Sequence, residues 1–109
     1  MQMKMRLKNG IMSRMVGKEL QDFAAAHKTF WWWVKDPRAL SEESIVEGTL
    51  NCGSWDDVQE LIRIMGMDHA AEAFYRDIGV SPRRRGNYHR KTLKYFLDYF
   101  ERHAPSAYA

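Results

Sequence analysis

Apolar residues recur at helical spacing along most of the chain, and no stretch alternates apolar and polar residues as a strand would. The strongest pattern runs from Tyr88 to His103, where large apolar side chains recur every three or four positions. A helix that is apolar over so much of its circumference needs neighbours on several sides. The sequence therefore predicts an all-α fold, a compact bundle of about five short helices around a central, aromatic-rich C-terminal helix.

The same spacing, together with residues that start and stop helices, predicts the shorter helices upstream. They cover Val16 to Lys28, Glu42 to Asn51, Trp55 to Met65 and His69 to Ile78. Ser54 and Asp57 have the spacing of a capping box, and Ser41 and Asp68 are further expected caps. Gly66 is expected in a left-handed conformation at a helix end.

Three segments divide the chain, whose 109 residues fit one hydrophobic core. Residues 1–15 are predicted to be a flexible, basic N-terminal segment, with a nucleic-acid-binding arm as the alternative. Residues 16–104 form the single helical domain, and residues 105–109 a frayed tail. Within the domain, residues 80–87 are predicted to be a loop, and Asn87 is expected to cap the last helix.

Four consecutive aromatic residues end in Trp31, Trp32 and Trp33. Such a run cannot hide on one face of a helix, so at least one ring must point away from the local core. One interpretation is core packing under other helices. The other is a partner-binding surface anchored by tryptophan, with stacking on a nucleotide base as a third alternative.

Charge is strongly segregated along the chain, although the net charge is only +3. Residues 41–79 carry nine acidic and two basic residues, whereas the segments on either side are basic. A basic cluster begins in the predicted loop and continues into the last helix; its residues are Arg83, Arg84, Arg85, His89, Arg90, Lys91 and Lys94. It could pair with the acidic middle, bind an acidic protein surface or bind nucleic acid.

Candidate chemistry is sparse, so we expect a protein that is not an enzyme and uses no cofactor. The histidines lie too far apart for a zinc site, and Cys52 has no partner base in its neighbourhood of the sequence. A single cysteine excludes an internal disulfide and is typical of the cytoplasm. No apolar run is long enough to span a bilayer, so no membrane association is expected.

One set of positions between residues 30 and 79 forms a pattern of its own: Trp33, Asp36-Pro37, Leu40, Ile45, Leu50, Gly53, Trp55-Asp56-Asp57-Val58, Leu61-Ile62 and Gly66. This pattern resembles a family of small, all-helical bacterial proteins often encoded beside nucleotidyltransferase toxins of the AbiEii/AbiGii type. The resemblance implies an antitoxin-like or regulatory role in a bacterial or phage cytoplasm, and it transfers no functional residue.

These observations favour a small binding protein that acts stoichiometrically on a protein partner, such as a toxin-like enzyme. Its partner-binding residues are expected to be the three tryptophans and Arg83, Arg84 and Arg85. The alternative is a nucleic-acid-binding regulator that uses the cluster from Arg83 to Lys91 and Lys94. A structural homo-oligomer is a third class.

Overall fold

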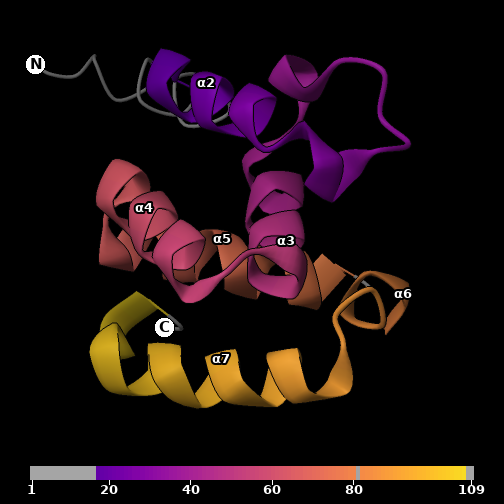
Figure 1. The fold of residues 1–109 in the computed structure, drawn as a ribbon. Coiled ribbons are helices and arrows are strands. Elements are labelled where there is room, and N and C mark those ends of the chain that lie inside the picture. Colours follow the sequence, from indigo (N-terminus) through magenta and orange to yellow (C-terminus); the bar gives the residue numbers. More distant parts are fainter. Residues whose placement is uncertain (1–16, 81, 108–109) are drawn as a thin grey trace, which may run out of the picture.

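The computed structural model describes residues 17–80 and 82–107 (Figure 1), so the predicted flexible segment 1–15 lies outside the described residues. The helices are α2 (Lys18–Ala26), α3 (Glu42–Cys52), α4 (Trp55–Met65), α5 (Met67–Val80), α6 (Pro82–Arg85) and α7 (Arg90–His103). Three 3₁₀ turns accompany them, η1 (Lys28–Trp31), η2 (Pro37–Ala39) and η3 (Pro105–Ala107). No strand occurs in these two ranges, which confirms the predicted all-α bundle.

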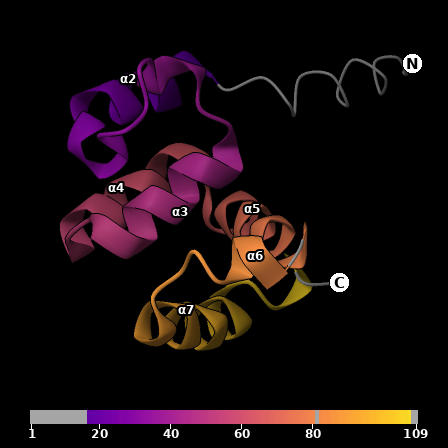
Figure 2. The ribbon, with the colours of Figure 1, turned by 90° about the vertical axis from the view of Figure 1, so that its right-hand side faces the viewer.

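Helix α5 occupies the middle of the bundle, between the α3 and α4 pair and α7 (Figures 1 and 2). Its inward face carries three alanines that are essentially inaccessible to solvent, Ala70, Ala71 and Ala73. Such small side chains let neighbouring backbones approach closely, and α3, α4, α6 and η3 all pack against α5. The Phe74 ring extends from α5 to the Tyr88 and Phe100 rings, with centroids 5.4 and 5.3 Å away.

The aromatic C-terminal helix lies at the edge of the bundle rather than at its centre (Figure 1). Only Phe96 and Phe100 of α7 are buried, while Tyr95 remains 53% exposed. Tyr95 and Tyr99 do not need a further helix to cover them, because their rings stack on each other with centroids 6.0 Å apart. Both rings also contact Trp55 of α4 edge-on. This ring cluster explains the wide apolar stripe, which the sequence pattern alone attributed to surrounding helices.

Several predicted helix caps are confirmed by local hydrogen bonds, although α2, α5 and α7 do not begin and end at the predicted residues. Ser54 and Asp57 form the capping box of α4, and the Ser41 side chain accepts a hydrogen bond from the Ser44 backbone N–H at 3.1 Å. The Asp36 side chain caps η2, where Pro37 occupies the first position. Gly66 adopts the expected positive φ, 89°.

Two caps were predicted at the wrong residue. Asp68 lies inside the first turn of α5, which begins at Met67. At the start of α7 the cap position is His89, and its backbone N–H donates to Asn51 Oδ1 at 3.1 Å. Asn51 also donates to the Asn87 carbonyl at 3.0 Å. A side chain of α3 therefore fixes this turn, where the sequence had suggested a local cap from Asn87.

The segments before and after α7 are more regular than predicted. The expected loop at residues 80–87 contains α6, which Pro82 opens at the position where proline favours a helix. After α7, residues 105–107 form η3, which packs on α5 and α7, and Ala104 before it is buried. Residues 105–107 therefore form a packed turn, in contrast to the frayed tail predicted for residues 105–109.

Candidate functional site

The tryptophan run is split between the core and the surface. Trp31, at the end of η1, is 2% exposed, and its indole Nε1 donates to the Ser44 carbonyl of α3 at 3.0 Å. The ring lies against Gly48, one turn further along α3. Trp31 is therefore a core residue and not an exposed anchor, although it contributes to the lining of the groove described below.

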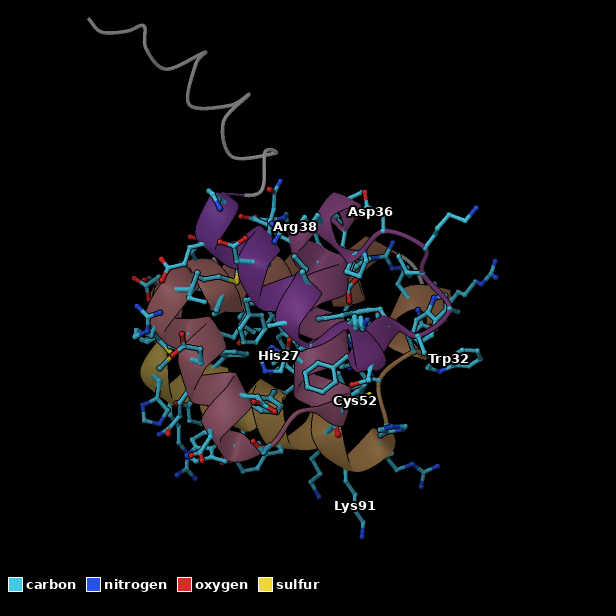
Figure 3. The ribbon with its side chains drawn as sticks, turned by 45° about the horizontal axis from the view of Figure 1, so that its top comes forward. His27, Trp32, Asp36, Arg38, Cys52 and Lys91 are labelled. Atoms are coloured by element: carbon cyan, nitrogen blue, oxygen red, sulfur yellow. The ribbon has the colours of Figure 1, made fainter. Side chains whose placement is uncertain are left out.

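Trp32 and Trp33 lie on the outside, with exposed fractions of 81% and 63%. Their rings contact each other edge-on, with centroids 5.7 Å apart. Figure 3 shows Trp32 pointing away from the body of the protein. The anchoring of Trp31 explains this exposure, because consecutive residues in this tight turn cannot all face α3. Two adjacent indoles are thus held at the surface by a third that is buried.

Trp33 and Arg83 line the same groove, although they are far apart in the sequence. The groove has a volume of about 530 Å³, and Leu40, Glu47, Arg84 and Asn87 also contribute to its walls. The two regions that the sequence analysis singled out separately, the tryptophans and the start of the basic cluster, therefore meet here. We define Trp32, Trp33 and this groove as the candidate site.

The rest of the basic cluster points elsewhere. Arg85 lines a separate hollow with Tyr75 and Glu101, and Lys91 lines another with Trp55 and Tyr95. Figure 3 shows Lys91 projecting from the body well away from Trp32. His89, Arg90 and Lys94 are exposed. The structure thus distributes the cluster over several faces and brings only Arg83 and Arg84 to the groove.

The acidic middle segment does not neutralise this cluster, apart from the pair of Asp77 with Arg84. Five of its other acids pair with His27, Arg63, His69 or Arg76, which lie outside the basic cluster; they are Glu42, Glu43, Asp57, Glu60 and Glu72. Within residues 17–80 and 82–107 seven lysine and arginine side chains form no ion pair. Two of them are Lys28 and Lys35, and the five that belong to the basic cluster are Arg83, Arg85, Arg90, Lys91 and Lys94. Internal pairing therefore explains Arg84 and leaves the other cations available to a partner.

A buried polar cluster lies behind the groove, and the sequence analysis missed it. Asp77 of α5 is completely buried, and its Oδ1 accepts from Arg84 Nη2 at 2.5 Å. Neither Asp77 Oδ2 nor the buried Tyr88 hydroxyl has a hydrogen-bond partner among the described residues. Burial and the Asp77 charge raise the pKa of the Tyr88 phenol. One signal was present: Asp77 follows Phe74 by three positions and so falls on the inward stripe of α5.

Glu47 of α3 belongs to the same cluster and lines the groove. Its partial burial, followed by the nearby Asp77 carboxylate, raises the pKa of Glu47 to about 7. A carboxyl group that shares its surroundings with a second one holds its proton more tightly, as expected for like charges. The groove therefore contains a group that changes charge near neutral pH.

The raised pKa predicts that the Glu47 carboxyl destabilises the fold as pH rises. The folded state binds this proton more tightly than the unfolded chain does, because the carboxyl has its ordinary pKa of 4.5 when unfolded and about 7 when folded. The contribution of Glu47 to the free energy of unfolding is therefore complete below pH 4.5 and is lost as the pH rises through 7. We expect a fall of about 1–2 kcal/mol between pH 5.5 and 8, allowing for the partial exposure of Glu47.

Urea unfolding of wild type and of Glu47→Gln at both pH values measures this fall. All other titrating groups are the same in the two proteins, so their contributions cancel when the two pH profiles are subtracted. Asp77 of α5 and Arg84 of α6 act on Glu47, Arg83 lines the same groove, and all three are unchanged in the variant. If the unfolding free energies of the two proteins changed with pH in parallel, the raised pKa of Glu47 would be contradicted.

No three histidine, cysteine or carboxylate side chains gather as metal ligands in the described parts of the chain. Cys52 is exposed at the end of α3. None of the described helices combines the length and apolar character needed to cross a membrane. Comparison with known proteins returns no matching family model, curated protein or solved structure.

Proposed function

We propose that this chain is a small, non-catalytic binding protein of the cytoplasm that acts by stoichiometric binding to a protein partner, in an antitoxin-like or regulatory role. The observation that carries the proposal is the exposed Trp32 and Trp33 pair beside the groove that Arg83 lines. Tryptophan and arginine are the residue types most enriched among those that dominate binding energy at protein interfaces.

The exposure of both indoles supports binding to a protein rather than a role within the fold. Neither ring is needed to fill the core, which already contains Trp31. Large exposed apolar side chains that are adjacent and bordered by charged groups are typical of interaction sites. The resemblance of residues 30–79 to proteins encoded beside nucleotidyltransferase toxins favours a toxin-like enzyme as the partner.

Affinity capture from the source cell tests the proposal with three versions of the protein. Wild type is expected to retain a partner in equimolar amount, and the double variant Trp32→Ala/Trp33→Ala is expected to lose it. Trp55→Ala is the matched control, because Trp55 is also exposed, at 44%, but lines a different hollow. Equal capture by the double variant and the control would contradict the proposal.

Nucleic-acid binding is the second candidate, and the five unpaired cations of α6 and α7 favour it. Binding through phosphates would weaken steeply with salt, because each neutralised phosphate releases counterions. Fluorescence anisotropy with single- and double-stranded oligonucleotides at about 50 and 200 mM salt would then show a loss of affinity of about 100-fold or more. A tryptophan-anchored protein interface would change far less over the same range.

A further inference from the structure

The groove at the candidate site has an apolar side and a polar side. Trp33, Val34 and Leu40 provide apolar lining, while Glu47, Asn87 and Arg83 provide polar groups. Its volume of about 530 Å³ lies in the range of pockets that hold a small ligand or a few side chains. An occupant must therefore combine apolar surface with at least one polar or charged group.

The charges around the groove favour an anion. Arg84 is already paired with the buried Asp77, so these two charges largely cancel. Arg83 is exposed and makes no ion pair among the described residues, so it leaves one positive charge on the wall. Glu47 is the remaining titratable group, and in its protonated form it adds no negative charge. With a proton on Glu47 the groove is thus positive, and without it the groove is close to neutral.

We propose that this groove receives an acidic side chain flanked by apolar side chains of the protein partner, with the carboxylate on Arg83 and the apolar groups against Trp33 and Leu40, and that Glu47 must be protonated for binding. The proposal rests on the proposed function, because it names the chemistry of the partner at that site. Charge complementarity selects this occupant: a cationic segment would meet Arg83 unfavourably, and a wholly apolar one would leave its guanidinium without a partner.

The proton on Glu47 gives the proposal its sharpest consequence. If only the protonated form binds, the apparent dissociation constant varies inversely with the protonated fraction. With a pKa of about 7, that fraction is about tenfold larger at pH 6 than at pH 8. Affinity for an acidic ligand is therefore expected to fall about tenfold over this interval, and Glu47→Gln, which is always neutral, should remove the dependence.

Three capped tripeptides, Leu-Glu-Leu, Leu-Gln-Leu and Leu-Lys-Leu, serve as probes, with the ¹³C-methyl signals of Val34 and Leu40 as the readout. The glutamyl peptide is expected to shift both signals saturably, about tenfold more tightly at pH 6 than at pH 8. Glu47→Gln should bind it equally at both pH values. Arg83→Gln, a change at an exposed position, should abolish the preference for the glutamyl peptide.

Equal or tighter binding of the other two peptides, unchanged affinity at pH 8, or no saturable shift up to roughly 10 mM would each overturn the proposal. These failures differ from failure of the proposed function. If the peptides give a negative result while capture of the partner still depends on Trp32 and Trp33, only the acidic occupant is wrong. If that capture fails, the proposed function is wrong irrespective of the peptide results.

Discussion

Replacing Trp31 by alanine is expected to destabilise the protein by about 3–5 kcal/mol, whereas the same change at the next residue, Trp32, should cost less than about 0.5 kcal/mol. Trp31 is 2% exposed and is hydrogen-bonded to the Ser44 carbonyl, so its removal leaves a large cavity and one lost hydrogen bond. Trp32 is 81% exposed and has little packing to lose.

Urea unfolding followed by far-ultraviolet circular dichroism measures both variants without relying on tryptophan fluorescence. The pair is internally matched, because the two residues are identical in type and adjacent in the chain. A typical domain has only about 5–15 kcal/mol of stability, so the loss at Trp31 is a large part of the total. Similar losses for the two variants would contradict the division of the run into a buried and an exposed part.

Replacing Gly48 by alanine is expected to destabilise the protein by about 2 kcal/mol or more, although alanine is the better helix former. A Cβ at Gly48 would lie 2.2 Å from Trp31 Nε1 and 2.4 Å from the adjacent ring carbon. The indole cannot move away cheaply, because it is enclosed and bound to Ser44. The added methyl group must therefore displace the ring or the helix.

Gly79 of α5 provides the control, since a Cβ there would meet no heavy atom within 4 Å. Gly79→Ala should stabilise the protein by about 0.5–1 kcal/mol through helix propensity alone. Thermal unfolding should thus move the two variants in opposite directions from wild type. A stabilised Gly48→Ala variant would show that the contact between Gly48 and Trp31 does not constrain the fold.

Local features of the fold could be predicted from the sequence because their causes are local. The capping box at Ser54 and the turn at Gly66 depend on residues within four positions of each other, and both are confirmed. The cap of α7 could not be predicted, since Asn51 comes from a different helix. The edge position of α7 could not be predicted for a related reason. Tyr95 and Tyr99 contact Trp55 near the surface, and their spacing along the helix is the same as that of residues buried in a core.

The candidate site was predictable only in part. The run of tryptophans predicted that at least one ring must be exposed. Which ring that is depends on the conformation of the turn, which buries Trp31 and exposes Trp32. Trp33 and Arg83 line the same groove because of the way α6 packs on the rest of the bundle. The spacing of apolar residues in the sequence gives no information about that packing. Glu47 and Asp77 come from different helices, and only the position of Asp77 on an apolar stripe indicated that one of them was buried.

The central claim is that Trp32 and Trp33 anchor a protein partner. Isothermal titration of the captured partner tests it most directly, with wild type, Trp55→Ala and the folded double variant Trp32→Ala/Trp33→Ala. We predict one-to-one binding for wild type and Trp55→Ala, and a dissociation constant raised about 30-fold or more in the double variant, equivalent to about 2 kcal/mol. An unchanged dissociation constant in the double variant would contradict the claim.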